Sequence, residues 1–596
     1  MQFKFLPTSC LVVAFSLAVF WAQAQAFTIA SIGDSYASGE GNPDKPQTFK
    51  LFGFGGVEKG PVWEEGQQCH RSRYAGPYLA AHEIARIVNQ PLTFIGLACT
   101  GAQIPVGLLG PFNPKTDDRV GPVPPQIEQL KAKVGSGRID LLLISIGGND
   151  MGFANLIKNC AILDSAQFIG FPGALCRQSQ AVVKTLRENQ EALPGKYKRL
   201  AQELRTMDIG AVLISEYPDP TKGADGKYCG SSGNHRMLLM HPETVRWAYY
   251  NVVKPLNAAI HAAATEYGWA VVPMMDVSAK HGYCAGKERW FLTEEEARFI
   301  QGPYEGGFSE RDHLPAGSVS DGSLHPNLAG HLVYARQIAN TFWEAGRMFD
   351  RTFYLASNAD VQQAVGTNYD AVLEHWKNQG LSEGRRGSRE FDVKFYLANY
   401  PDLQSSLGTN YRAAVGHWVS QGLPVEGRRG SREFDVQFYL AAHPELQEAF
   451  GTNYTQAFDH WTKQGLPVEG RRGSRELDVQ FYVQAYPDLQ EMFGTNYAAA
   501  FDHWIKHGLP LEGRQGSREF DARFYLATYD DLQGALGGNY LAALDHWITT
   551  GRAEGRLGVH AYHFRPLLFG DHRQHHFRLL DFGTDKNHHF RQLLFH

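Results

Sequence analysis

The stretch FTIASIGDSYASGEG, residues 27–41, decides the fold. It begins as a short run of mainly apolar and β-branched residues and breaks at Gly33-Asp34-Ser35, a pattern that predicts a buried strand followed by a tight turn. In open α/β sheets, ligands bind at the carboxyl ends of the strands. Ser35 is therefore predicted to lie at the edge of the sheet where chemistry takes place.

Strand and helix patterns alternate through the first half of the chain. Buried strands are predicted at 92–98, 139–146, 210–215 and 270–274, with helical patterns around 179–206 and 242–266. Strands that alternate with helices predict βαβ units, a mainly parallel sheet and right-handed crossovers. The fold class is therefore α/β, with helices on both faces of the sheet.

Three further motifs follow predicted strands or open a helix. Gly101 lies just past the strand at 92–98, and Asn149 belongs to a GGND turn after the strand at 139–146. His325 lies in DGSLHPN, residues 321–327, at the entrance of a helical pattern. A glycine past a strand end lets backbone N–H groups approach a ligand closely. Taken alone, Gly101 is more typical of an ordinary turn, whereas a GGND turn directly after a strand favours a functional role for Asn149.

Taken in order, these motifs resemble blocks I, II, III and V of the SGNH/GDSL hydrolases, a family of serine esterases and lipases. The resemblance covers roughly residues 27–345 and implies the family's flavodoxin-like, three-layer α/β/α fold. It implies that Ser35 is the nucleophile and His325 the general base. The backbone N–H groups of Ser35 and Gly101, with the Asn149 side-chain amide, would then form the oxyanion hole.

One position departs from the family pattern. The family usually has Asp three residues before the catalytic His, but that position is Gly322 here, and Asp321 lies four residues before His325. Asp321 is the predicted partner of the ring. The alternative is a backbone carbonyl near residues 322–324 that accepts the Nδ1–H. His331, within the following helix, is interpreted as structural.

The N-terminus has the features of a secretory signal. Lys4 precedes an apolar run at residues 11–21, and AQAQA follows with a cleavage site after Ala24 or Ala26. A signal peptide is therefore predicted at 1–26, which makes the protein secreted or bound to the cell surface. A transmembrane helix is the weaker alternative because the run is short, and no other segment is apolar enough to span a bilayer.

Cysteine usage agrees with export. Of seven cysteines, Cys10 lies in the predicted signal, and the other six are Cys69, Cys99, Cys160, Cys176, Cys229 and Cys284. An even set in an exported chain predicts three disulfides. Nearest-neighbour pairing is favoured, and the secreted three-disulfide members of the family have a similar pattern. Zinc is the competing interpretation, but the chain has no C-x-x-C pair, so no metal site is predicted.

The second half of the chain repeats itself five times, over residues 346–557. Phe-Asp or Leu-Asp pairs recur every 42 or 43 residues, and a His-Trp pair recurs in step with them, at His375, His417, His460, His503 and His546. Each unit is predicted to hold two or three short helices stacked into an all-α array. Asp392 and Asn410 are predicted N-caps, and the Gly after each His-Trp helix a C-cap.

The repeats carry no clear chemistry of their own. One His beside a Trp in each unit is more typical of a packing or hydrogen-bond anchor than of a metal ligand. The units resemble short helical repeats of bacterial secreted and surface proteins, which implies binding to a surface, a glycan or a protein. A G-x-S-x-G match at residues 380–384 lies inside a repeat and is not interpreted as a nucleophile. The His- and Phe-rich tail, 558–596, is predicted to be poorly ordered.

The predicted signal and cysteines indicate export, and the family resemblance implies a serine ester hydrolase that needs no cofactor. The secreted relatives with this cysteine pattern imply a lipase or esterase that cleaves esters of apolar acyl chains. A net charge of −5 gives no reason to expect nucleic acid as a partner. The substrate is instead a small-molecule or lipid ester. A carbohydrate or acetyl esterase is the enzymatic alternative. The alternative from another functional class is a surface-binding protein with a vestigial hydrolase domain. The intact set of site residues argues against this alternative.

Overall fold

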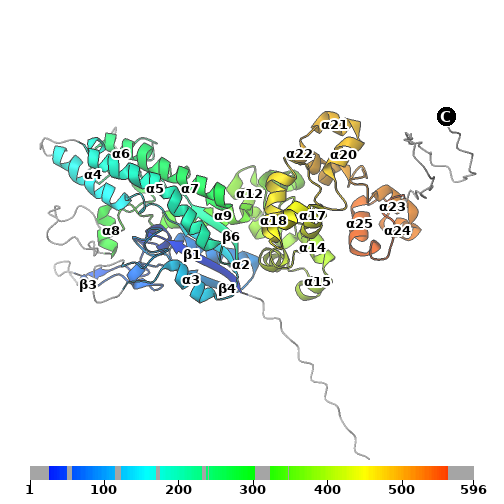
Figure 1. The fold of residues 1–596 in the computed structure, drawn as a ribbon, viewed down its shortest axis with the longest axis horizontal. Coiled ribbons are helices and arrows are strands. Elements are labelled where there is room, and N and C mark those ends of the chain that lie inside the picture. The colour runs from blue at the N-terminus through cyan, green and yellow to red at the C-terminus, as the bar shows by residue number, and fades with distance from the viewer. Residues whose placement is uncertain are drawn as a thin grey trace, which may run out of the picture.

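The computed structural model describes residues 26–49, 57–113, 122–168, 175–230, 237–238, 240–301, 322–345 and 348–560. The expected signal peptide, Asp321 and the tail beyond residue 560 lie outside these ranges. Figure 1 shows an α/β unit at one end of the long axis and a run of short helices leading away from it. The domain limits expected at 27–345 and 346–557 stay predictions.

A five-stranded parallel sheet forms the centre of the α/β unit. Its strands lie in the order β4 (Leu92–Gly96), β1 (Phe27–Gly33), β5 (Ile139–Ser145), β6 (Ile209–Ser215) and β7 (Ala270–Val272). All neighbouring pairs are parallel, so that Ile29 of β1 is paired with Phe94 on one side and Leu141 on the other. The predicted α/β fold with a mainly parallel sheet is confirmed.

Helices cover both faces of this sheet because the buried strands are apolar on both sides. Ile29 and Leu141 pack on the face covered by α2 (Gly76–Val88) and α9 (Leu328–Ala345). Ile32 and Leu142 pack on the opposite face, which is covered by α3 (Gln126–Val134), α5 (Gln180–Leu204) and α7 (Lys254–Tyr267). The result is the expected three-layer arrangement.

Shorter elements complete the α/β unit. They are α1 (Ser35–Ser38), β2 (Thr48–Phe49), β3 (Val57–Lys59), η1 (Gln67–Cys69), α4 (Phe153–Phe168), η2 (Cys176–Gln178), α6 (Pro242–Ala248), η3 (Tyr249–Val253), η4 (Gly286–Glu288) and α8 (Glu294–Gln301). Strands β2 and β3 pair as an antiparallel ribbon apart from the main sheet. None of the described helices combines the length and the apolar composition needed to cross a bilayer.

Each of the five repeats consists of three seven-residue helices followed by a π-helical turn. The helices are α10 (Arg351–Ser357), α11 (Ala359–Val365), α12 (Tyr369–His375), α14 (Val393–Asn399), α15 (Pro401–Leu407), α16 (Tyr411–His417), α17 (Val436–Ala442), α18 (Pro444–Phe450), α19 (Tyr454–His460), α20 (Val479–Ala485), α21 (Pro487–Phe493), α22 (Tyr497–His503), α23 (Ala522–Thr528), α24 (Asp530–Leu536) and α25 (Tyr540–His546). The turns are η5 (Trp376–Gly380), η6 (Trp418–Gly422), η7 (Trp461–Gly465), η8 (Trp504–Gly508) and η9 (Trp547–Gly551), and α13 (Leu381–Glu383) follows the first. Asp392 and Asn410 cap α14 and α16 as predicted, because their side chains accept backbone N–H groups of the first turns.

One hydrogen bond recurs in every repeat. The Tyr hydroxyl of the first helix lies 2.8–3.0 Å from Nδ1 of the His that precedes Trp, in the pairs Tyr354–His375, Tyr396–His417, Tyr439–His460, Tyr482–His503 and Tyr525–His546. These contacts fit the anchor interpretation of the five histidines.

The Gly after each His-Trp helix has a different role from the C-cap that we predicted. Gly380 has right-handed helical backbone angles, with φ of −55°, so it does not reverse the chain. A Cβ atom on the equivalent Gly465 would lie 2.3 Å from the Tyr439 hydroxyl oxygen. The position requires glycine because the Tyr–His hydrogen bond passes directly beside the backbone there.

The repeats coil, so that units far apart in the sequence touch. Arg389, between the first and second units, forms an ion pair with Asp502 of the fourth, 113 residues away, and Arg432 pairs with Asp545 of the fifth at the same spacing. Neighbouring units are joined by pairs such as Arg429–Glu476, 2.7 Å long and buried. The array is therefore a superhelix, in which ion pairs join both neighbouring units and units nearly three repeats apart.

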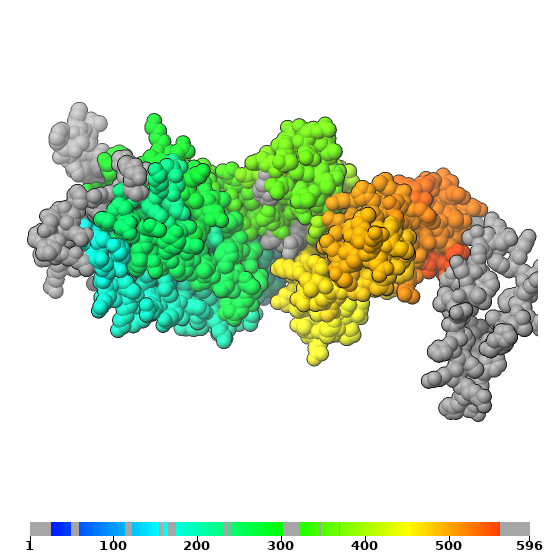
Figure 2. Space-filling model, turned by 90° about the horizontal axis from the view of Figure 1, so that it is seen from above, coloured from blue at the N-terminus to red at the C-terminus, as the bar shows by residue number. Residues whose placement is uncertain are grey.

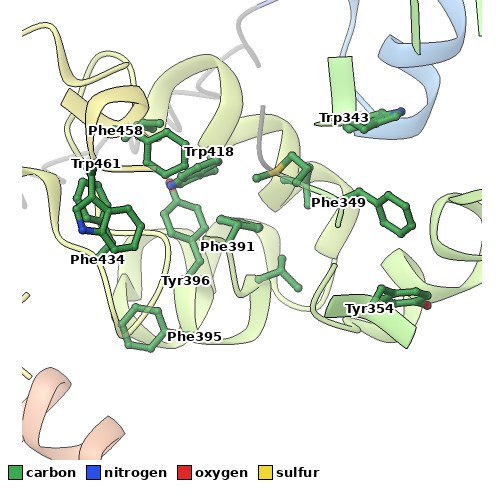
Figure 3. Close-up of a cluster of buried hydrophobic side chains, with 14 of the residues drawn as sticks. Trp343, Phe349, Tyr354, Phe391, Phe395, Tyr396, Trp418, Phe434, Phe458 and Trp461 are labelled. Atoms are coloured by element: carbon green, nitrogen blue, oxygen red, sulfur yellow. The ribbon is translucent and has the colours of Figure 1, made fainter. Parts of the chain in front are cut away.

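The α/β unit covers the beginning of this superhelix. Lys377 of the first repeat forms an ion pair with Glu83 of α2, and Gly416 of α16 packs against the end of α2 at Val88. Buried aromatic rings continue from Trp343 of α9 to Phe349 and Tyr354 of the first repeat (Figure 3). The Trp343 ring also lies 5.7 Å from the Trp376 ring. Figure 2 shows the two parts in contact along one molecule.

Candidate active site

Ser35 begins α1 directly after β1, at the carboxyl end of the sheet. Gly33 precedes it with φ of +140°, and a Cβ there would lie 2.0 Å from the Ser145 carbonyl oxygen, so only glycine fits this close approach of β1 and β5. Asp34 caps α1, because its side chain accepts the Tyr36 N–H. The serine hydroxyl is thus held on a tight strand-to-helix turn at the sheet edge.

The three predicted oxyanion groups follow three adjacent strands. Gly101 comes after β4, Ser35 after β1 and Asn149 after β5, and parallel neighbours bring these turns to one edge. The Asn149 amide donates to the Ala102 carbonyl at 3.1 Å, which ties it to the turn that contains Gly101. Within the described residues, the N–H groups of Ser35 and Gly101 donate to no other protein atom, which leaves both available to a ligand.

His325, in the segment before α9, lies within hydrogen-bond distance of Ser35. Its Nε2 lies 2.7 Å from the Ser35 hydroxyl oxygen, and its Nδ1 lies 3.2 Å from the Ser323 carbonyl oxygen. Burial lowers the pKa of His325, so that the ring is poised as a neutral base. Among the described residues, the Ser323 carbonyl is the group that faces Nδ1. Asp321 lies outside them, so its predicted role as the partner of the ring stays a prediction.

Backbone contacts fix the segment that carries His325. The Tyr36 hydroxyl donates to the Leu324 carbonyl at 2.9 Å, and the Asn42 amide donates to the Pro326 carbonyl at 2.7 Å. On the other side, the Leu292 N–H donates to the carbonyl of His325 itself at 2.9 Å. Two of these three donors, Tyr36 and Asn42, lie within seven residues of Ser35, so Ser35 and His325 are oriented by the same stretch of chain.

A buried hydrogen-bond chain connects block I with the Gly-Gly-Asn-Asp turn. The Tyr217 hydroxyl donates to Asp34 and accepts the Gly148 N–H at 2.9 Å. Burial raises the pKa of Asp34 to about 7, although the Tyr217 and Tyr36 donors act in the opposite direction. Sequence patterns did not reveal Tyr217, which lies just beyond β6 and is remote from every motif.

A second buried cluster lies beside the histidine. The Glu40 carboxylate is 2.7 Å from His70 Nδ1 and accepts from the Gln301 amide at 2.6 Å. Burial would raise the pKa of Glu40, but the neighbouring His70 and His325 outweigh it and lower this pKa to about 2. Glu40 belongs to the Ser-Gly-Glu-Gly extension of block I, but the sequence does not indicate which residues surround its side chain.

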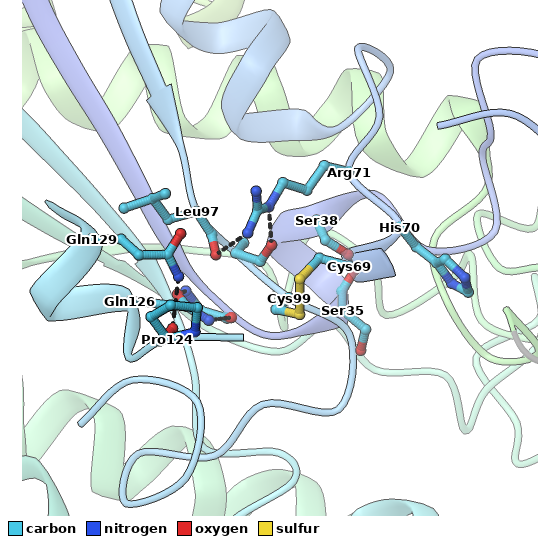
Figure 4. The surroundings of a disulfide bond; sticks show 12 residues. Ser35, Ser38, Cys69, His70, Arg71, Leu97, Cys99, Pro124, Gln126 and Gln129 are labelled. Atoms are coloured by element: carbon cyan, nitrogen blue, oxygen red, sulfur yellow. Dashed lines mark hydrogen bonds between the residues drawn. A yellow bond between two sulfur atoms is a disulfide. The ribbon is translucent and has the colours of Figure 1, made fainter. Parts of the chain in front are cut away.

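Three disulfides cross-link the α/β unit, with the predicted nearest-neighbour pairing Cys69–Cys99, Cys160–Cys176 and Cys229–Cys284. The first joins the η1 loop to the turn after β4, close to Ser35 (Figure 4). Arg71 holds the same strand end, because its side chain donates to the Ala98 carbonyl at 2.8 Å and to the Leu97 carbonyl at 3.2 Å. The turn that carries Gly101 is thereby fixed from two sides.

Two residues that the sequence analysis set aside lie apart from this chemistry. His331 is buried in α9 and accepts the Gly76 N–H at 3.2 Å, and burial lowers its pKa to about 3. Ser382 of the G-x-S-x-G match is exposed in α13, where its hydroxyl donates to the Gln379 carbonyl at 2.7 Å. The printed partners of His331 and Ser382 are backbone groups, whereas Ser35 and His325 are hydrogen-bonded to each other.

The geometry can perform acyl transfer. A hydroxyl with a neutral imidazole at hydrogen-bond distance is an activated nucleophile. Free N–H groups and an amide at the adjacent strand ends can bind the charge that develops on a carbonyl oxygen.

Comparison with known proteins agrees with this geometry. Residues 31–333 match the model of the GDSL-like Lipase/Acylhydrolase family. Lipase 1 of Streptomyces coelicolor is 31% identical over 257 residues, which cover 43% of this chain and 72% of that protein.

Among solved structures, the extracellular lipase of Streptomyces rimosus is 18% identical, with 53% of this chain and 100% of the lipase covered, at a TM-score of 0.33. A carbohydrate esterase is 10% identical, with 53% and 64% covered, at a TM-score of 0.23. Likeness at this level adds no weight of its own. The family model and the curated relative carry the assignment: the chain belongs to the GDSL-like lipase/acylhydrolase family and is a carboxylic ester hydrolase.

Proposed function

We propose that this ester hydrolase is secreted and cleaves carboxylic esters of apolar acyl chains through an acyl-enzyme on Ser35. The observation that carries the proposal is the 2.7 Å contact between the Ser35 hydroxyl oxygen and His325 Nε2. The name of the Streptomyces coelicolor relative, Lipase 1, supports the apolar acyl group.

In the proposed mechanism Ser35 attacks the ester carbonyl while His325 takes its proton on Nε2. The Ser323 carbonyl accepts from Nδ1–H, which keeps the tautomer in which Nε2 is the free base. The N–H groups of Ser35 and Gly101 and the Asn149 amide bind the oxyanion. His325 returns the proton to the leaving alcohol, and water then releases the acid by the same steps.

Export is supported by the covalent chemistry of the chain. Three disulfides persist in oxidising compartments and are rare in the cytosol. The predicted signal at residues 1–26 points in the same direction. The five repeats are then an attachment module outside the cell, which binds a surface, a glycan or a protein.

A series of p-nitrophenyl esters of increasing chain length tests the proposal. Wild type should prefer long chains, and Ser35→Ala should lose on the order of 10⁴-fold or more of kcat. Ser382→Ala is the matched control, because it removes the serine of the other candidate motif and should leave the rates unchanged. Activity on acetyl esters alone would favour the carbohydrate or acetyl esterase. Equal rates for wild type and Ser35→Ala would favour the surface-binding protein.

A further inference from the structure

The starting point is a buried carboxylate that the mechanism above does not use. Glu40 lies two residues beyond the end of α1 and is 1% exposed. Its neighbours His70 and Gln301 are each 6% exposed, and the Trp63 ring stacks on His70 with centroids 4.7 Å apart. Burying an ionised carboxylate is unfavourable unless the charge is paired. Such a group close to a catalytic histidine is a candidate for electrostatic assistance.

Glu40 reaches the histidine segment through Gln301. The Gln301 amide donates to Glu40, and its oxygen accepts the Gly41 N–H at 3.0 Å. A Cβ atom on Gly322 would lie 3.0 Å from that same Gln301 oxygen, so the two residues are in contact. Gly322 immediately precedes Ser323, whose carbonyl faces His325 Nδ1. The Glu40–Gln301 unit therefore supports the backbone that orients the ring.

The negative charge of Glu40 can stabilise the positive charge that forms on His325 during the reaction. When Ser35 gives up its proton, His325 becomes an imidazolium, and the Ser323 carbonyl facing Nδ1 is a dipole without a full negative charge. An anion near the ring would stabilise that state. Glu40 is ionised and raises the pKa of His325, against the larger, opposing effect of burial.

The other titratable groups around His325 do not supply this charge. His70, from the η1 loop, acts on His325 in the opposite direction to Glu40 and more weakly. His331, on α9, has its pKa lowered to about 3 by burial and is therefore neutral. Ser35 and Tyr36 face the ring from α1. Of the described groups, Glu40 alone is a carboxylate that raises the pKa of His325.

We propose that Glu40 is a positioning residue of the proposed hydrolase. Its carboxylate, held by His70 and Gln301, stabilises the His325 imidazolium from beneath the histidine segment. It takes the electrostatic role that a carboxylate on Nδ1 has in a three-residue catalytic set. This inference rests on the proposed roles of Ser35 and His325.

The test is the pH dependence of kcat/KM in Glu40→Gln, which keeps the shape and removes the charge. The acid limb should move to lower pH, because His325 loses protons more readily without the anion. The plateau of kcat should fall roughly tenfold, because the imidazolium is less stable. KM should change little, since Glu40 does not touch the substrate. Glu65→Gln, on the exposed loop before η1, is the matched control and should leave the profile unchanged.

A second variant tests the same idea through the partner that keeps Glu40 ionised. His70→Gln removes the ring that offsets the burial of Glu40, so the pKa of Glu40 rises, its charge is lost and the acid limb should move to lower pH, as in Glu40→Gln. Titrating Ser35 with a phosphonate ester counts the competent sites, and rates per site separate a catalytic effect from poor folding. If Glu40→Gln yields no competent sites, the direction of the His70→Gln shift alone decides.

Two results would overturn the inference. The first is an unchanged acid limb in both variants, with losses confined to KM or to the melting temperature. The second is a shift that appears in Asp321→Asn and is absent from Glu40→Gln, which would make Asp321 the charged partner. Either result, together with an inactive Ser35→Ala, leaves the proposed hydrolase intact. Full activity in Ser35→Ala would instead remove the hydrolase mechanism itself.

Discussion

The Ser35 hydroxyl oxygen lies 2.7 Å from His325 Nε2, although 290 residues separate the two along the chain. β1 delivers the serine to the carboxyl edge of the sheet, and the segment before α9 returns the histidine to the same edge. The Tyr36 and Asn42 side chains hold that returning segment by its carbonyl groups. The contact therefore depends on a few bonds made by the block that carries the nucleophile.

Asn149→Ala should lower kcat by about 10²–10³-fold, because one donor to the oxyanion is lost. KM should change little, since the amide acts mainly on charge that develops in the transition state. Steady-state kinetics on a short p-nitrophenyl ester measure both. Asn378→Ala, at an exposed amide of the first repeat, is the control. An unchanged kcat in Asn149→Ala would remove this residue from the oxyanion hole.

Tyr217→Phe should destabilise the protein by about 1–3 kcal/mol, because Asp34 and the Gly148 N–H lose their buried partner. The deficit should be larger at pH 8 than at pH 5. Asp34 has its pKa raised to about 7, so it is protonated at pH 5 and can itself donate, whereas at pH 8 it is a buried anion without the hydroxyl. Denaturant unfolding at both pH values measures this, with exposed Tyr74→Phe as control. Equal deficits at the two pH values would contradict the expectation.

Gly465→Ala should destabilise the repeats by about 1–3 kcal/mol, because the new methyl would lie 2.3 Å from the Tyr439 hydroxyl oxygen. Gly534→Ala is the matched control. Gly534 lies within α24 with nothing within 4 Å of its Cβ position, so the change should stabilise the helix by about 0.5–1 kcal/mol. Thermal melting of the full chain distinguishes the two signs. A neutral or stabilising Gly465→Ala would show that the Tyr–His bond has room to move.

The repeats should lose stability as the pH falls below about 6.5. Burial lowers the pKa of His417, His460 and His503, which are therefore held neutral in the fold. An unfolded chain binds their protons at higher pH than the folded chain does. The stability from the neutral rings is therefore present above the unfolded pKa and is lost as the pH falls through it.

The triple variant His417→Gln, His460→Gln and His503→Gln isolates this effect. Glutamine can accept from the Tyr hydroxyl but does not titrate. Melting temperatures of the variant should fall less than those of wild type between pH 7.5 and pH 5. Parallel curves for the two proteins would locate the acid sensitivity elsewhere in the chain.

The catalytic block order, the parallel sheet and the repeats could all be predicted from sequence, because each depends on local patterns. Buried apolar runs with Gly-rich ends specify strands and turns, and adjacent parallel strands bring Gly101, Ser35 and Asn149 to one edge. The caps Asp392 and Asn410 were predictable for the same reason. The Gly after each His-Trp helix was misread, because the sequence does not show that Tyr439 passes beside the backbone of Gly465.

The sequence by itself determined the α/β fold class and the five repeats, and its resemblance to a known family predicted Ser35 and His325 as the residues that carry the ester hydrolase chemistry. Only the tertiary structure decided that the Ser323 carbonyl faces the histidine, that Glu40 lies buried between His70 and Gln301, and that Arg432 reaches Asp545 in a distant repeat. Local patterns report how each segment folds along its own length. Contacts between segments depend on side-chain packing and on the burial of charge, and both arise only in the folded chain.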